Sequence, residues 1–332
     1  MTTIPPPSAR FDQVRVTAGL RPAKPPRRIL SHSNDTWAVR DERLGEVVLR
    51  VSWRGDTARI GREIAVAAQL PAEVRYPEVL GHGVTGELAY SLTRLAPGRS
   101  LAECWPHLPA GQRRSAVSQL AAMLQALHRW TPPPELTDLL LARPYQPPDR
   151  ITALLGADLT PLPIDRAVEL ARYAAGQPEQ DPGLLRAAAE LLVQLAPADQ
   201  PVDDPAAHGL IHGDLQLGNL LWSEQGELTM LDFEWTRFGP PLLDLQRLCD
   251  HADTDALTGV DTHPAVLRWL EPDYPAAFTG PHPATRLRLY GLAYTVRDLL
   301  VNPPDQDRQS RLRRLVDNTW PAPGALPESL TR

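Results

Sequence analysis

The chain has 332 residues, 42% hydrophobic and 22% charged, which is ordinary for a globular protein and enough for one bilobal domain or two small ones. The net charge of −6 argues against nucleic acid as a partner. Cys104 and Cys249 suggest neither a disulfide framework nor a metal site, and no apolar run reaches membrane-spanning or signal-peptide length, so we expect a cytoplasmic protein without a membrane partner.

The first part of the chain is expected to hold one sheet. Residues 1–28 are rich in proline and arginine, which is typical of a loosely ordered arm. Residues 29–98 then show the patterns of two strands, a helix and two more strands. These patterns predict a small sheet with a single helix, before a hinge at the end of the last strand.

Helical periodicity dominates the rest of the chain, residues 99–332. The pattern over 112–130 is the clearest, and the run of prolines at 132–134 ends it. Asp181 stands at the N-cap position of another predicted helix. The further helices are expected at 165–174, 182–195, 245–251, 264–270 and 284–300.

One segment interrupts these helices. It reads Leu-Ile-His-Gly-Asp-Leu-Gln-Leu-Gly-Asn over 210–219 and Leu-Asp-Phe-Glu-Trp over 231–235. Apolar runs on both sides of a polar turn predict a β-hairpin, whose open end brings Asn219 and Asp232 about 5 Å apart. Oxygen ligands of this kind suit Mg²⁺.

The order and spacing of these polar residues are those of a kinase. Protein kinases place a catalytic Asp five residues before a metal-binding Asn, and a second metal-binding Asp downstream. Asp214 is therefore predicted to be the catalytic base, with Asn219 and Asp232 as metal ligands. Residues 210–219 are accordingly named the catalytic loop and residues 231–235 the metal loop. The alternative is that all three only form turns and that His212 is a packed core histidine. For His212 itself we expect a residue that braces the loop rather than one that takes part in the reaction.

Residues 208–248 resemble the catalytic core of the aminoglycoside phosphotransferase and choline kinase superfamily, which has His-Gly-Asp where protein kinases have His-Arg-Asp. The segment 239–245 resembles the family's Gly-Asp-Pro…Asp-Leu element, with Pro240 in place of the usual Asp. The matching acid, Asp244, is then expected to brace the catalytic loop, although it could instead be a helix N-cap. The resemblance covers about residues 29–250. It implies an α+β, bilobal, protein-kinase-like fold, with a small antiparallel sheet plus helix in the N-lobe and a larger, mostly helical C-lobe.

The phosphate-binding residue departs from the usual pattern. Kinases use a strand lysine paired with a helix glutamate, but the sole lysine, Lys24, lies in a proline-rich segment unfit for a strand. We assign the role to Arg50, in a β-branched run, with Glu63 on the following helix as its partner. The alternative is an unrelated surface arginine and surface glutamate.

The resemblance also implies where the nucleotide binds. The loop containing Ser33 and Asn34 is expected to offer polar groups to the phosphates of ATP or GTP. The Thr93 carbonyl and the Leu95 amide are expected to contact the purine at the hinge between the lobes.

The acceptor implied by the resemblance is a hydroxyl on a small molecule, held by acidic residues when that molecule is cationic. Glu234 and Trp235 in the metal loop are candidates, although Glu234 could equally brace the loop. A downstream acidic cluster is a second candidate, with a solvated face as its alternative: Asp250, Asp253, Asp255 and Asp261. A further set at helical spacing is more typical of a core or surface face: Tyr290, Tyr294 and Asp298.

Three functions follow from these expectations. The first is an antibiotic phosphotransferase using Mg²⁺ with ATP or GTP, and the second is a metabolic kinase for choline, a sugar or an amino alcohol. The third, a noncatalytic nucleotide-binding protein, rests on the missing lysine, and the intact Asp214, Asn219 and Asp232 argue against it. The oligomeric state, monomer or homodimer, is left open.

Overall fold

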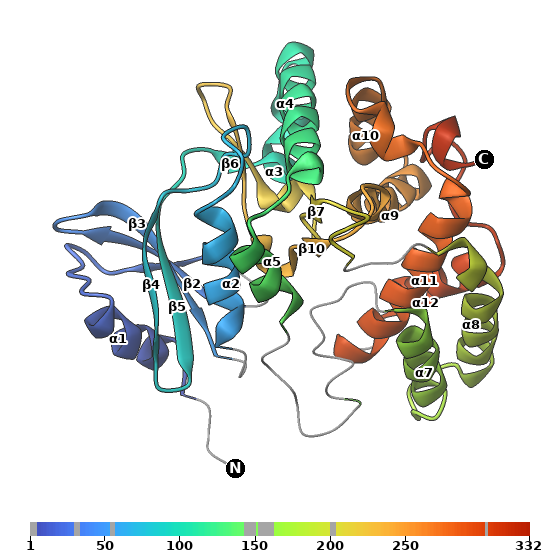
Figure 1. Cartoon of the computed structure of the whole chain (residues 1–332), viewed down its shortest axis with the longest axis horizontal. Helices are drawn as coiled ribbons and strands as arrows, with labels where there is room; N and C mark the ends of the chain where they lie inside the picture. The colour runs from blue at the N-terminus through green and yellow to red at the C-terminus, as the bar shows by residue number, and fades with distance from the viewer. Residues whose placement is uncertain are drawn as a thin grey trace.

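The computed structural model describes residues 5–29, 34–53, 57–142, 151, 163–199, 204–302 and 305–332. The fold is α+β and bilobal, with the strands of the first hundred residues and the two helices among them on one side of the molecule, and most of the other helices on the other side (Figure 1). This confirms the fold class expected from the sequence. Among the residues that the structure describes, no helix combines the length and the apolar character needed to cross a bilayer.

The N-lobe is an antiparallel sheet with the strand order β1-β2-β3-β5-β4. A single helix, α2 (Ala58–Ala67), connects β3 to β4, as the sequence patterns predicted. The β2–β3 turn closes at Gly45, whose φ of 77° favours glycine. The strands are β1 (Arg27–Ile29), β2 (Asp35–Asp41), β3 (Gly45–Ser52), β4 (Val79–Thr85) and β5 (Leu88–Arg94).

The central strand β3 separates two faces of this sheet. Val47, Leu49 and Val51 alternate along the strand and lie in one buried cluster. Successive side chains of a strand point to opposite faces, so Arg50 points away from that cluster. It points toward α2, where Glu63 pairs with it. The alternation of β3 thus places the guanidinium of Arg50 on the side that faces the C-lobe.

The prediction of a loosely ordered arm over residues 1–28 was wrong for the part that the structure describes. Helix α1 (Pro7–Thr17) packs on the sheet through the buried Phe11 and Val14, and Arg10 makes a buried ion pair with Asp35 at 2.6 Å. Proline is well tolerated in the first turn of a helix, where Pro7 stands. The sequence did not predict α1 because few positions of this helix are apolar.

The C-lobe is mostly helical, and the β8–β9 hairpin interrupts its helices as expected. Asp181 caps α8 by accepting from the amides of Gly183 and Leu184 at 3.0 Å. The helices are α3 (Leu101–Cys104), α4 (Ala110–Arg129), α5 (Pro134–Leu141), α7 (Ile164–Ala174), α8 (Pro182–Leu195), α9 (Leu242–Thr258), α10 (Thr262–Asp273), α11 (Pro283–Val301) and α12 (Gln306–Val316). The short strands are β6 (Arg99–Ser100), β7 (Leu210–Ile211), β8 (Leu220–Trp222), β9 (Leu228–Met230) and β10 (Arg237–Phe238).

Candidate active site

The catalytic loop begins where β7 ends, and it turns sharply at Gly213. This residue has a φ of 82°, and a Cβ at its position would lie 2.1 Å from the carbonyl oxygen of Trp235. Only glycine fits such a close approach of two backbones. The glycine of the His-Gly-Asp sequence therefore has a steric cause, since the catalytic loop must pass directly against the end of the metal loop.

Asp244, in the first turn of α9, holds this loop in place. Its Oδ2 accepts from the amide of His212 at 2.9 Å, and its Oδ1 accepts from the amide of Gly213 at 2.8 Å. The Nε2 of His128 on α4 donates to Oδ2 at 2.8 Å. Burial acts to raise the pKa of Asp244, but the hydrogen bond and charge of His128 hold it below the ordinary value. Asp244 is not the N-cap, which is Pro241.

His212 joins the catalytic loop to the metal loop. Its ring is fully buried, and its Nε2 donates to the carbonyl oxygen of Leu231 at 2.8 Å. Its Nδ1 accepts from the amide of Asp214 at 3.2 Å, which is consistent with a neutral ring. This is the geometry of a bracing residue, and the ring is directed at protein backbone.

Three side chains surround the carboxylate of Asp214. Gln216 and Asn219 donate to Oδ2 at 3.1 and 3.3 Å, and the Nε of Arg247 on α9 lies 3.3 Å from Oδ1. About a fifth of the Asp214 side chain is exposed, so a substrate hydroxyl can reach it. Arg247 was not among the residues identified from the sequence, because no local motif marks it.

The hairpin brings the two expected metal ligands together. The amide of Leu231 donates to the carbonyl of Asn219 at 2.8 Å. This backbone hydrogen bond places Asp232, the next residue after Leu231, beside Asn219. Asp232 has a left-handed conformation with φ 67°, which redirects its carboxylate, and aspartate tolerates this region better than most residues. The Asn219 side-chain nitrogen donates to the Asp214 carbonyl at 2.9 Å, which leaves its Oδ1 for a cation.

Arg50 connects the N-lobe to the metal loop. Its Nη1 donates to both carboxylate oxygens of Glu63 at 2.8 Å, and its Nη2 donates to Asp232 at 2.8 Å and to Glu234 at 3.4 Å. Burial acts to lower the pKa of Arg50, yet these carboxylates hold it well above its ordinary value. Tyr76, which the sequence did not identify, fixes Glu63 by donating to it at 2.9 Å.

The acids around Arg50 form a candidate cation site. One carboxylate oxygen from each of Glu63, Asp232 and Glu234 lies within 4.8 Å of the others. Burial raises the pKa of both Asp232 and Glu234, and nearby carboxylates raise it further against the opposing effect of Arg50. Three carboxylates around one guanidinium leave an excess of negative charge, and the buried Oε1 of Glu234 has no hydrogen-bond partner among the described residues. The residues present therefore fit Mg²⁺, which prefers carboxylate oxygens together with substrate phosphates.

The expected nucleotide contacts have different outcomes. Asn34 lies at this site and donates to Glu234 Oε2 at 3.2 Å, while Ser33 lies outside the described residues. Thr93 is buried in β5 at the hinge. The amide of Leu95 donates to the carbonyl of Glu46 at 3.1 Å, so its single donor is already used. The expected contact of Leu95 with the purine would require this hydrogen bond to break, and it stays a prediction.

The downstream acidic cluster is committed to arginines of α12. Asp253 is 2% exposed, pairs through both oxygens with Arg314 at 2.6 and 2.7 Å, and accepts from the amide of Ala322. Asp250 is buried and contacts Arg311. Both acids are buried and paired with arginines of α12, which counts against the expectation that Asp250 and Asp253 bind a cationic acceptor. That expectation stays a prediction. Their wider cluster is paired as well, Asp255 with His263 and Asp261 with Arg268.

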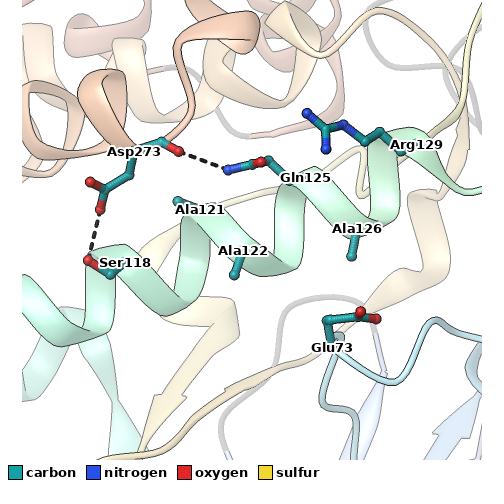
Figure 2. Close-up of a pocket in the computed structure, with 8 residues that line it drawn as sticks. All are labelled: Glu73, Ser118, Ala121, Ala122, Gln125, Ala126, Arg129 and Asp273. Carbon is teal, nitrogen blue, oxygen red and sulfur yellow. Dashed lines mark hydrogen bonds between the residues drawn. The ribbon is translucent and has the colours of Figure 1, made fainter.

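A surface hollow of about 580 Å³ lies elsewhere, along α4 (Figure 2). Figure 2 shows Asp273 turned toward α4, where its carboxylate accepts from Ser118 and its carbonyl accepts from Gln125, both at 2.8 Å. The residues that line this hollow include none of those around Asp214 or Arg50. The motif residues, and not this hollow, define the candidate active site.

Comparisons with known proteins assign the chain to a family. A family model described as the phosphotransferase enzyme family matches residues 27–277, which is most of the chain. The chain belongs to the phosphotransferase enzyme family. A search of curated protein sequences found no match to the chain.

Solved structures of other phosphotransferases share the fold. A thermostable mutant of aminoglycoside phosphotransferase APH(4)-Ia is 17% identical with a TM-score of 0.60, and the match covers 93% of this chain and 99% of that one. A GDP complex of aminoglycoside 2'-phosphotransferase-IIIa is 16% identical with a TM-score of 0.60 and coverages of 95% and 98%. A streptomycin-ATP complex of APH(2")-IIa is 14% identical with a TM-score of 0.56 and coverages of 99% and 100%. At such identities the similarity is evidence of the fold.

Proposed function

We propose that this phosphotransferase moves the γ-phosphate of ATP, or of GTP, to a hydroxyl group of a small molecule. The observation that carries the proposal is the convergence of Asp214, Asn219, Asp232 and Arg50 at one point between the lobes. Two of these residues come from one loop, one from the next loop, and one from the N-lobe sheet. A set of turn-forming residues with no common role has no reason to converge in this way.

Each residue has a distinct part in the proposed reaction. Arg50, oriented by Glu63, binds the nucleotide phosphates. Asp232 and the Oδ1 of Asn219 would hold Mg²⁺, which would neutralise charge on the phosphates. Asp214 accepts the hydroxyl proton while the acceptor oxygen bonds to the γ-phosphorus. The bond from that phosphorus to the bridging oxygen breaks, so the products are ADP, a phosphate monoester and the proton on Asp214.

Glu234 belongs to the nucleotide side of the site in this proposal. It was a candidate for binding the acceptor, but its Oε2 lies against Arg50 and Asn34, and its other oxygen is buried near Asp232. The carboxylate is thus placed to add a ligand for a cation or to set the charge around the phosphates.

The names of the structural neighbours suggest antibiotics as the first acceptors to examine, since they are described with hygromycin B and streptomycin. The experiment is a screen of hydroxylated antibiotics and metabolites with Mg²⁺ and ATP or GTP, read by nucleoside diphosphate release and by mass spectrometry of the product. The proposal predicts a phosphate monoester of at least one acceptor. Nucleotide hydrolysis that never yields a phosphorylated acceptor, for either nucleotide, contradicts it.

A further inference from the structure

Arg247 places a positive charge beside the carboxylate of Asp214. Its Nε lies 3.3 Å from Asp214 Oδ1, and the two side chains are 19% and 21% exposed, so a ligand can reach both. Arg247 stands on α9 three residues after Asp244, and residues at this spacing share one face of a helix. Helix α9 therefore supplies both the residue that braces the catalytic loop and a cation next to the catalytic base.

The ring of Tyr294 on α11 holds this cation in position. The guanidinium of Arg247 is 4.4 Å from the centre of the Tyr294 ring. An aromatic face attracts a guanidinium without occupying its N–H donors. Burial acts to lower the pKa of Arg247, but Tyr294 and Asp214 hold it above its ordinary value. Arg247 is thus charged and preorganised, with its donors still able to bind a ligand.

The Nε of Arg247 is an unused donor. It is buried and has no hydrogen-bond partner among the residues that the structure describes, because its approach to Asp214 lacks hydrogen-bond geometry. The other oxygen of Asp214, Oδ2, already accepts from Gln216 and Asn219, so Oδ1 is the oxygen left for the acceptor hydroxyl. A buried donor without an acceptor is costly. An oxygen of a group bound next to Oδ1 would supply that acceptor.

The transferred phosphoryl group must come close to this guanidinium. In the proposed reaction the acceptor oxygen lies about 2.6–3.2 Å from Asp214, and the phosphorus bonds to that same oxygen. Arg50 instead lies at the metal loop, where its Nη2 donates to Asp232 at 2.8 Å. Once Asp214 takes up the proton, its carboxyl group is neutral and Arg247 loses its ion-pair partner. The phosphoryl oxygens are then the nearest negative charge that the reaction brings to Arg247.

We propose that Arg247 is a catalytic residue, which donates to the oxygens of the phosphoryl group while that group moves to the acceptor. The acceptor O–H bond breaks and its proton goes to Asp214, the acceptor oxygen bonds to phosphorus, and the bond to the nucleoside diphosphate breaks. The inference rests on the proposed phosphotransfer and adds a residue to it. Phosphoryl transfer is catalysed by positioning and by cations that stabilise the developing charge, and a planar guanidinium matches phosphoryl oxygens.

The test uses a mimic of the transferred group, so it needs no known acceptor. Aluminium fluoride with ADP and Mg²⁺ resembles the phosphoryl group during transfer, whereas AMP-PNP resembles the nucleotide before transfer. Each is titrated by calorimetry into the full chain. We expect aluminium fluoride to tighten the binding of ADP to the parent protein by at least about tenfold, because mimics of a transition state bind more tightly than ground-state ligands.

Variants of Arg247 connect this gain in affinity to the residue. Arg247→Gln should remove most of the gain, while AMP-PNP affinity stays within a few-fold. It should also lower the kcat of ATP hydrolysis by water at least about 10²-fold with little change in KM, since an arginine in this role is worth about 10³–10⁵ in kcat. Arg247→Lys should keep part of the gain, because an ammonium retains the charge but lacks the planar fork. A merely structural residue would change both affinities together.

Arg113→Gln is the matched control. Arg113 on α4 also lies over an aromatic ring, 5.7 Å from the centre of Trp105, and it donates to the carbonyl of Pro106 at 3.0 Å. This variant should leave both the gain from aluminium fluoride and the kcat of hydrolysis unchanged. Tyr294→Leu removes the ring that holds Arg247, so it should reduce the gain more than Tyr294→Phe, which keeps the ring.

Four results overturn the inference: no gain from aluminium fluoride in the parent protein, an unchanged gain in Arg247→Gln, an unchanged kcat in Arg247→Gln, or a loss of AMP-PNP affinity in both Arg247 variants. Each leaves the proposed function intact if the parent protein binds AMP-PNP with Mg²⁺ and phosphorylates some acceptor. Absence of Mg²⁺-dependent AMP-PNP binding in the parent protein would instead remove the proposed function, and with it the basis of the inference.

Discussion

Arg50 stands at the strand position where we expected the phosphate-binding lysine of a kinase. Its planar group donates in two directions, to Glu63 through Nη1 and to Asp232 through Nη2. A lysine ammonium is a compact charge and cannot span two fixed acceptors in this planar way. The strand pattern and the helix after it were enough to predict the Arg50–Glu63 pair, because both partners lie within one short stretch of chain.

We expect Arg50→Ala to raise the nucleotide KM by about 10- to 100-fold, because hydrogen bonds between charged groups contribute about 1.5–3 kcal/mol. Arg50→Lys should retain part of the activity. Lys24→Ala, a change at an exposed residue of the proline-rich segment, is the control and should have no effect. Steady-state kinetics against ATP measure this, and equal sensitivity at positions 24 and 50 would refute the assignment.

The acids beside Arg50 predict a pH dependence of metal-nucleotide binding. Asp232 and Glu234 have pKa values raised above their ordinary 3.8 and 4.5, so they take up protons at a higher pH than exposed carboxyls do. Mg²⁺ must displace those protons. The affinity for Mg·AMP-PNP should therefore fall as the pH is lowered toward the raised pKa values of Asp232 and Glu234, at a pH where the exposed carboxyls remain ionised.

Glu234→Gln removes one of these carboxyls and should move the fall in affinity to lower pH, whereas Glu224→Gln, in the exposed hairpin turn, should not move it. Calorimetric titrations from about pH 7 to about pH 5 measure the effect. An affinity that is constant over this range in the parent protein would show that the acids do not hold the metal.

The residues that sequence reasoning missed share one property, which is that their partners are distant in the chain. His128 reaches Asp244 from α4, Tyr76 reaches Glu63, and Arg247 reaches Asp214 from α9. No local spacing marks such side chains. Only the packing of the helices decides which of many similar residues meets the site.

At the scale of elements, regular apolar spacing was what the sequence revealed best. The helix predicted at 182–195 has the observed bounds, and the hairpin after Asn219 is present. Helix α12 was missed, because only Leu312 and Leu315 of its residues are buried and its exposed positions are strongly charged. Short helices with few apolar residues are stabilised by packing that a single sequence does not display.

Asp244 contacts three parts of the fold, so its replacement should lower the free energy of unfolding. Asp244→Ala leaves His128 and the His212 and Gly213 amides without their acceptor. We expect a decrease of about 3–5 kcal/mol in the free energy of unfolding, as for other broken buried pairs. Chemical denaturation measures it.

The matched control for Asp244→Ala is Asp261→Ala, in an exposed pair with Arg268. Surface pairs of this kind contribute little, so its denaturation curve should nearly overlay that of the parent protein. If the two variants unfold alike, Asp244 does not brace the loop.

At the scale of the whole molecule, the reaction site is assembled by both lobes. Arg50 crosses from the sheet to Asp232, and Arg59 on α2 lies over Trp235 of the C-lobe. The resemblance predicted this bilobal arrangement, since it follows from the order of the elements. The arginines that lie against Trp235 and Tyr294 could not be predicted, because α2, α9, α11 and α12 supply them together.

In the proposed reaction the central role is that of Asp214, which receives the proton of the acceptor hydroxyl. The direct measurement compares the parent protein with Asp214→Asn for two quantities, the transfer of labelled γ-phosphate to an acceptor and the affinity for Mg·AMP-PNP. General base and positioning roles are worth about 10²–10⁴ in rate, so transfer should fall by that factor while nucleotide affinity changes only a few-fold. Transfer within a few-fold of the parent rate would contradict the assignment of this site.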